Sequence, residues 1–435
     1  MKFKSLYIIL IFIGFAKKVN AQELLPLEDA IKIALENNYE IKLAKNDLKI
    51  DETNNYIGNA GMLPSINANI TDNNTILDTK QTQADGTERE LNNARNMNLS
   101  YGVSLDWTVF DGLRMFARKE QLNILQKQGE AELKLAILTK IGDVYLAYFD
   151  LVQQQQQLKA LDTAIVISNE RVRTAENRYS IGKASKLEVL NAKVDLNADR
   201  SLLLKQQELF KNAKIALNQI LARDVQTDFM VTEETSIDKN LNFQELKESA
   251  ANQNPQLQAQ LLAKNIAEQQ LKQVKAGRYP TLRITSGYNF TRSEASLGFV
   301  TQSSGQGFNY GFAATVPIFN GSQQNRNEKI AKIQIENANM VLEQQKLNLE
   351  TQLNSAYQSY ATNLELIKVE EQNLEIAEQN LDITLAKFKI GTITPIEFRT
   401  AQQNFIDAKV RYSNALYLTK IHEISLKELA GNLSF

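Results

Sequence analysis

The polar and apolar residues of the chain repeat with two different periods. Over residues 27–61, and again over 243–277, apolar side chains recur at every third or fourth position, which predicts a helix in each range. After each of these helices the period changes to two, so that apolar and polar side chains alternate. The alternation predicts one β-hairpin over 64–110 and another over 280–319, each with an apolar face and a polar face.

Two longer stretches, 113–180 and 322–389, also have the helical period, and the second contains neither glycine nor proline. At a rise of about 1.5 Å per residue, each helix would be about 100 Å long. A short turn follows each of them and leads into a return helix, over 185–222 and 394–430. Apolar positions on both sides of each turn predict two-stranded coiled-coil tips. On the first return helix the predicted seam consists of Leu187, Leu190, Val194, Ser201 and Leu204.

The two turns have the same arrangement of helix-ending and helix-starting residues. Gly182 and Gly391 lie where a helix needs a left-handed closing residue, a conformation that glycine adopts without a Cβ clash. Ser185 and Thr394, three positions later, are suited to cap the backbone N–H groups of the next helix. Each turn is therefore predicted to form a tight helical hairpin.

Glu188 and Glu397 stand three positions after these capping residues, and two interpretations apply to them. In the first, each glutamate reaches back to complete a capping box. In the second, Glu397 contributes to a ring of carboxylates from several copies around an axis, which would favour cations. The first interpretation is favoured for Glu188, and both stay open for Glu397.

The chain is predicted to contain two copies of one repeat. Gly182 and Gly391 are 209 positions apart, and the same spacing relates other residues on both sides of them, namely Phe110 with Phe319, Gly112 with Gly321, and Leu217 with Leu426. Nearer to the start of each repeat the spacing is 216, which pairs Ala60–Pro64 with Ala276–Pro280. Such recurrence indicates a duplication. The repeats are expected to cover 22–222 and 241–435, with a connector over 223–240.

Residues 1–21 have the features of a signal peptide: early lysines, an apolar run and small residues at the end of the segment. An uncleaved anchor is the alternative, and no other stretch approaches the roughly 18 apolar residues of a membrane-spanning helix.

Without the lysines of this segment, the chain has 45 basic and 50 acidic residues. The resulting net charge of −5 does not suggest a nucleic-acid partner. The chain has no cysteine, so it can form no disulfide and carry no lipid on a cysteine.

The alternating strands are predicted to lie in a membrane. A soluble sheet with its apolar face on a core is the alternative, but almost all the rest of the chain is long polar helix that offers no such core. Aromatic side chains on the apolar face suit a transmembrane β-barrel, and the predicted lipid-facing ones are Tyr101, Trp107, Tyr288, Phe308, Tyr310 and Phe312. Four strands cannot close, and open edges are costly in lipid, so other copies must complete the barrel. Two copies would give eight strands, and three would give twelve, which can leave a lumen.

Residues that carry enzyme chemistry are sparse. His422 is the single histidine, there is no cysteine, and no glycine-rich phosphate loop is present. The six methionines form no cluster of the kind that binds soft metals. We therefore expect no catalytic site, no cofactor and no metal site, and we expect His422 to be structural.

Several motifs together make the chain similar to a known family. They are Asn254-Pro255, the corner Val316–Gly321 with its counterpart Phe110-Asp111-Gly112, and the doubled turn with a Tyr/Phe-x-x-Gly-x-x-Ser/Thr pattern. The mature chain resembles the TolC-like outer-membrane efflux proteins of Gram-negative bacteria over nearly its whole length. The resemblance implies a homotrimer with a 12-stranded β-barrel in the outer membrane, four strands per chain, continued by a long α-helical barrel through the periplasm. It also implies a passive channel whose tips meet a periplasmic adaptor and an inner-membrane transporter.

The resemblance further implies a gate at the helical tips. The gate candidates are Glu188, Glu397, Phe388 and Ile393, where Phe388 and Ile393 replace a tyrosine and an arginine found in some members. Candidates for contact with an adaptor are Ile181, Gly182, Ser185, Ile390, Gly391 and Thr394.

Two other classes of protein are alternatives. One is an exported coiled-coil scaffold or adhesin without a pore, and the other is the adaptor itself, with one helical hairpin and compact β domains. The duplicated hairpin and the alternating strands argue against both. The sequence leaves the exported substrate and the class of pump open.

Overall fold

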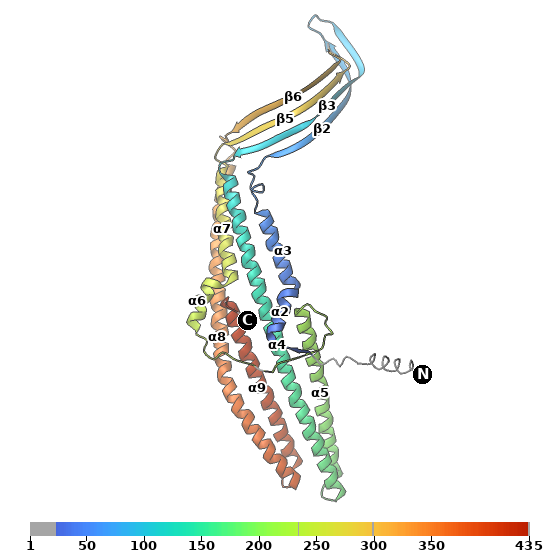
Figure 1. Ribbon diagram of the computed structural model, residues 1–435, viewed down its shortest axis with the longest axis vertical. Helices are drawn as coiled ribbons and strands as arrows, with labels where there is room; N and C mark the ends of the chain where they lie inside the picture. The colour runs from blue at the N-terminus through green and yellow to red at the C-terminus, as the bar shows by residue number, and fades with distance from the viewer. Residues whose placement is uncertain (1–22, 234, 298–299, 434–435) are drawn as a thin grey trace, which may run out of the picture. The chain divides into compact units, whose positions relative to one another are not determined.

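The protein is described here by a computed structural model (Figure 1), which covers residues 23–233, 235–297 and 300–433. The predicted signal peptide, residues 1–21, lies outside the described residues. The chain is mostly α-helical, and its largest sheet has four strands. No helix in the described part of the chain is long and apolar enough to cross a membrane.

Four short helices occupy the two ranges for which the sequence predicts a single helix each. They are α2 (Leu27–Asn37) with α3 (Tyr39–Asn54), and α6 (Phe243–Gln253) with α7 (Pro255–Ala276). The first pair breaks at Asn38, whose side-chain oxygen accepts the N–H of Glu40 at 2.9 Å and so starts the next helix. The second pair breaks at Asn254 because Pro255, the first residue of α7, has no N–H to continue α6.

Both break-point asparagines make the same kind of tertiary contact. The side-chain amide of Asn38 donates to the carbonyl of Ile220 at 2.9 Å, and that of Asn254 donates to the carbonyl of Leu429 at 2.9 Å. Ile220 and Leu429 are the last residues of the two return helices. Each break is therefore held against the end of a return helix.

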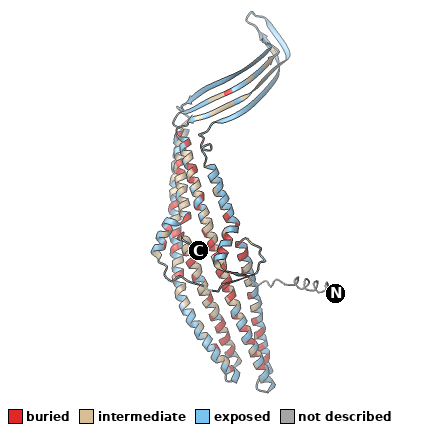
Figure 2. Ribbon diagram, viewed as in Figure 1, coloured by how far each residue is buried: buried red, intermediate tan, exposed pale blue. Residues whose placement is uncertain are grey.

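The four-stranded sheet consists of two long hairpins. Its strands are β2 (Ser65–Thr82), β3 (Glu88–Phe110), β5 (Thr281–Ala295) and β6 (Gln302–Thr315), all antiparallel in the order β2-β3-β5-β6. The edge strands β2 and β6 are almost entirely exposed, whereas the central strands β3 and β5 mix exposed and half-buried residues (Figure 2). Within the described part of the chain, the edge strands β2 and β6 have no partner strand on their outer sides.

Two long helices each lead through a turn into a shorter one. They are α4 (Arg114–Ser180) with α5 (Lys186–Ile220), and α8 (Gln323–Ile390) with α9 (Pro395–Leu429). Each pair forms a helical hairpin, because only five residues join α4 to α5 and only four join α8 to α9.

The chain divides into two compact units, and each draws on both halves of the sequence. Of the described residues, the first comprises 23–44, 133–233, 235–255 and 346–433, and the second comprises 45–132, 256–297 and 300–345. The first unit has an apolar core around Tyr148 and a small parallel sheet of β1 (Glu23–Leu25) and β4 (Phe229–Val231). The Tyr148 hydroxyl donates to the Leu25 carbonyl at 3.0 Å and accepts the N–H of Thr232 at 3.0 Å, so it ties both short strands to α4.

Candidate functional site at the helical turns

The two turns have the glycine geometry that their sequences predict. Gly182 has φ +73° and Gly391 has φ +82°, both in the left-handed region. The N–H of Gly182 donates to the carbonyl of Tyr179 at 3.0 Å, and the N–H of Gly391 donates to that of Phe388 at 3.0 Å. These bonds satisfy the last carbonyls of α4 and α8 and allow the chain to reverse.

The two predicted capping residues act differently. Thr394 and Glu397 form a complete capping box, since each side chain accepts the backbone N–H of the other residue, at 3.2 and 3.4 Å. Ser185 accepts the N–H of Glu188 at 3.3 Å, but the Glu188 carboxylate lies 3.5 Å from the guanidinium of Arg178 instead of completing the box. The capping-box interpretation therefore describes Glu397 fully and Glu188 only in part.

Two of the gate candidates lie in an apolar core between the hairpins. Phe388 is fully buried and stacks on Phe398 with ring centroids 4.9 Å apart, and Ile393 packs against the same cluster. Arg178 of α4 lies over the Phe388 ring, 5.9 Å from its centroid. Among the candidates for contact with a partner, Ile181 and Ile390 are exposed at the ends of the two hairpins.

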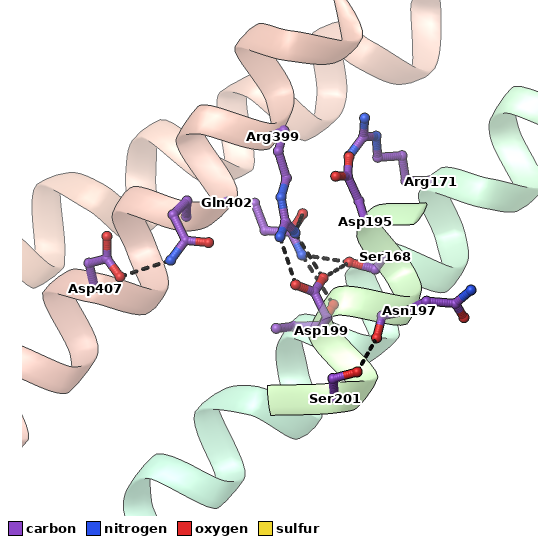
Figure 3. A network of polar contacts seen from close by, with 11 residues as sticks. Ser168, Arg171, Asp195, Asn197, Asp199, Ser201, Arg399, Gln402 and Asp407 are labelled. Atoms are coloured by element: carbon purple, nitrogen blue, oxygen red, sulfur yellow. Dashed lines mark hydrogen bonds and ion pairs between the residues drawn. The ribbon is translucent and has the colours of Figure 1, made fainter. Parts of the chain in front are cut away.

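A buried polar network joins the hairpins a few turns away from the glycines (Figure 3). Asp199 of α5 accepts two hydrogen bonds from the guanidinium of Arg399 of α9, at 2.7 and 2.8 Å, and a third from the Ser168 hydroxyl of α4. Gln402 of α9 donates to Ser168 at 2.8 Å and to the Ala164 carbonyl at 3.2 Å. The hydrogen bonds to Asp199 raise the pKa of Arg399 further above its usual range, so the guanidinium stays charged.

The same region contains a groove between α5 and α9 with a volume of about 510 Å³. Ser185, Glu188 and Thr394 line it, so the structure brings these three predicted residues together. Exposed apolar side chains of Leu187, Val194 and Ile396 lie along the groove, and the Arg171–Asp195 ion pair and Arg399 supply its charges.

The predicted seam of α5 is wrong. Leu187, Leu190, Val194 and Leu204 are exposed, whereas Val189, Ala192, Leu196 and Asp199 of the same helix are buried. The buried face mixes apolar and polar side chains, and α5 is held to its neighbours partly by hydrogen bonds through Asp199 and Gln206. The sequence analysis therefore did not identify Asp199, Arg399 and Gln402. Asp195 and Asp199 are four positions apart, so they share one helix face and their charges repel. That spacing was a signal that could have indicated this network.

The six predicted lipid-facing aromatic residues are all exposed and share one face of the sheet. The strand register places Trp107 opposite Ile284, and Tyr288 opposite both Val103 and Phe308. Tyr101 stacks on Phe290 with ring centroids 5.0 Å apart, and Tyr310 and Phe312 follow Phe308 at alternate positions of β6.

The other face of the sheet is polar. The side-chain amides of Asn69 and Asn289 donate hydrogen bonds to neighbouring strands, to Ser104 at 3.0 Å and to Asn309 at 2.9 Å. These polar residues alternate with the apolar ones, so they line the opposite face.

Comparison with known proteins gives a consistent result. A family model described as "Outer membrane efflux protein" matches residues 30–223 and 246–432. The chain is 22% identical to the outer membrane protein TolC of Salmonella enteritidis over 80% of this chain and 72% of that protein. It is 23% identical to the probable outer membrane lipoprotein SilC of Salmonella typhimurium over 92% of this chain and 84% of that protein.

The fold is also similar to that of solved structures. The CmeC outer membrane channel of Campylobacter jejuni superimposes with a TM-score of 0.78 at 17% identity, covering 93% of this chain and 85% of the channel. At this level of identity the likeness shows the fold alone.

Proposed function

Because the chain belongs to the outer membrane efflux protein family, a family of channels in the outer membrane, we propose that it forms the outer-membrane duct of a tripartite efflux or type I secretion system. In this proposal three copies assemble around one axis. Their twelve strands form a β-barrel, their helices continue it as a periplasmic tunnel, and substrates pass without any bond being changed.

The observation that carries this proposal is the sheet, whose outer edges are unpaired among the described residues and whose two faces contrast. One face bears exposed aromatic residues, and the other bears asparagine, serine and glycine. In lipid, unpaired backbone groups along β2 and β6 would cost several kcal/mol each, which favours pairing with other copies. Twelve strands can enclose a lumen, and the polar face would supply its wetted wall.

The helical turns are the proposed gate. Opening would separate the first hairpin (α4 and α5) from the second (α8 and α9), and the Asp199–Arg399 network and the Phe388 cluster oppose that separation. Phe388 and Ile393 would act there through this cluster, and Glu188 would act through its contact with Arg178. Glu397 is exposed, so the capping box leaves its charge available to the passage.

The proposed partners are a periplasmic adaptor protein and an inner-membrane transporter. The exposed apolar side chains in the groove between α5 and α9 suit a helical hairpin of an adaptor, which would insert its own apolar stripe. Ile181, Gly182, Ser185, Ile390, Gly391 and Thr394 would contact the same partner at the turns. The transporter would supply the energy for export.

Fractionation followed by conductance measurement tests the proposal. The protein should resist carbonate extraction from outer membranes, remain trimeric in mild detergent and form ion-conducting channels in planar bilayers. An exported scaffold or adhesin without a pore would instead give no conductance. Recovery as a soluble monomer would overturn the proposal.

A further inference from the structure

The corner between β3 and α4 packs against a specific segment of the same chain. Phe110, the last residue of β3, pairs with Leu282 of β5, and Gly112 is buried. A Cβ on Gly112 would lie 2.4 Å from the carbonyl oxygen of Ala276 and 2.8 Å from the Cβ of Tyr279. The corner therefore fits closely against the segment that joins α7 to β5, and only a glycine fits there.

The boundaries of the elements recur along the chain with two spacings. Helices α4 and α8 begin 209 positions apart, whereas α3 and α7, and also β2 and β5, begin 216 positions apart. On this spacing the corner of Phe110 and Gly112 corresponds to that of Phe319 and Gly321. The segment Ala276–Leu282 likewise corresponds to Ala60–Ile66.

In the part of the chain that the structure describes, the second corner has no such close fit at its glycine, although it lines a pocket with Gly277 and Arg278. Ile318 is 95% exposed and Phe319 is 82% exposed. Among the described residues, no atom lies within 4 Å of where a Cβ on Gly321 would be. In the corresponding segment Ala60 is buried and the Met62 carbonyl accepts a hydrogen bond from Trp107, but Leu63 and Ile66 are exposed. The sheet order places the two uncovered surfaces next to opposite edges, β6 and β2, so one copy cannot join them.

We infer that the corner Val316–Gly321 of one copy packs against the segment Ala60–Ile66 of the next copy, as the first corner packs against Ala276–Leu282 within the chain. This inference rests on the proposed assembly of several copies into one barrel. Strands β2 and β6 run in opposite directions, so β6 of one copy can continue the antiparallel order onto β2 of its neighbour. That pairing brings the end of β6 beside the start of β2, which is where both surfaces lie.

A difference between corresponding side chains of the two repeats, on or next to the adjoining helices, supports this contact. Within the chain, Gln121 of α4 is buried and accepts a hydrogen bond from Gln273 of α7 at 2.9 Å. The residues at the corresponding positions are Ile330 of α8 and Ile57, just after α3. Both are partly exposed, Ile330 by 47% and Ile57 by 41%. A polar pair inside the chain is thus replaced by an apolar pair on two surfaces that a single copy leaves open, and burial of both isoleucines would favour association.

Cross-linking between differently tagged copies tests the inference, because the chain has no cysteine of its own. Ile57→Cys is placed on a chain with one tag and Ile330→Cys on a chain with a larger tag, and the two are produced together. A short bismaleimide is then applied to outer membranes. We expect a cross-linked pair that carries both tags, and neither variant produced alone should give it.

The matched control uses the corresponding positions inside the chain. Gln121→Cys and Gln273→Cys on separate chains should give no cross-linked pair, whereas both on one chain should react with each other without a change in oligomeric size. Trimers that contain both isoleucine variants but give no pair with both tags would overturn the inference and leave the proposed duct intact. Equal cross-linking by the glutamine variants on separate chains would also overturn it. Absence of any trimer would refute the proposed duct and this interface with it.

Discussion

Removal of the Arg399 guanidinium is expected to weaken the contact between the two helical hairpins. Asp199 accepts two hydrogen bonds from Arg399 and one from Ser168. Its side chain is only 2% exposed. Arg399→Leu therefore leaves a buried carboxylate with a single side-chain donor.

The size of the effect follows from this burial. Removing one partner of a buried ion pair costs about 3–5 kcal/mol when the remaining charge is uncompensated. Ser168 still donates to Asp199, and Arg399 is itself partly exposed, so we expect a loss of about 2–3 kcal/mol. In the double variant Asp199→Asn with Arg399→Leu neither charge of this pair remains, and the loss should fall to about 1 kcal/mol.

Channel recordings in planar bilayers measure the consequence. If the passage opens by separation of the hairpins, the loss of about 2–3 kcal/mol destabilises the closed state of each copy. This corresponds to a factor of about 30 to 150 in the ratio of open to closed states. The open fraction should therefore be highest for Arg399→Leu, intermediate for the double variant and lowest for the unmodified protein.

Arg411→Leu is the matched control on the same helix. Arg411 pairs with Glu370 at 3.0 Å, and this more exposed pair joins α8 to α9 within one hairpin. Its loss should cost less than about 1 kcal/mol and leave the open fraction unchanged. The reasoning is refuted if Arg399→Leu conducts like the unmodified protein, or if the double variant opens as readily as the single one.

Three further substitutions test local features of the same unit. Gly391→Ala forces a Cβ into the left-handed region and should cost about 1–2 kcal/mol, which a lower melting temperature of the detergent-solubilised protein would report. Thr394→Ala removes the oxygen that caps α9 and should cost about 1 kcal/mol, with faster hydrogen exchange confined to the first turn of that helix. Burial raises the pKa of the Glu428 carboxyl, so its charged form destabilises the fold once the pH exceeds that raised pKa. Glu428→Gln should therefore raise the free energy of unfolding near neutral pH, and this gain should vanish as the pH falls and the native carboxyl becomes protonated. Denaturant unfolding at several pH values measures that difference, and a gain that grows on acidification would contradict the assignment.

The sequence by itself determined the features that depend on neighbours a few positions away. Gly182 and Gly391 end helices because a left-handed residue is needed at those points. The alternation in the strands identifies which residues share a face, since that depends only on the pleat. The motifs were also sufficient to identify the family, which the family model confirms.

The tertiary structure decided which helix faces are buried and which charges meet. Asp199 and Arg399 are 200 positions apart, and nothing local to either residue indicates the other. Leu187 and Val194 looked like core residues by spacing, yet they are exposed, because burial on α5 depends on where α4 and α9 lie beside it. The helical period determines which residues share a face, but only the packing of distant segments determines which face is buried.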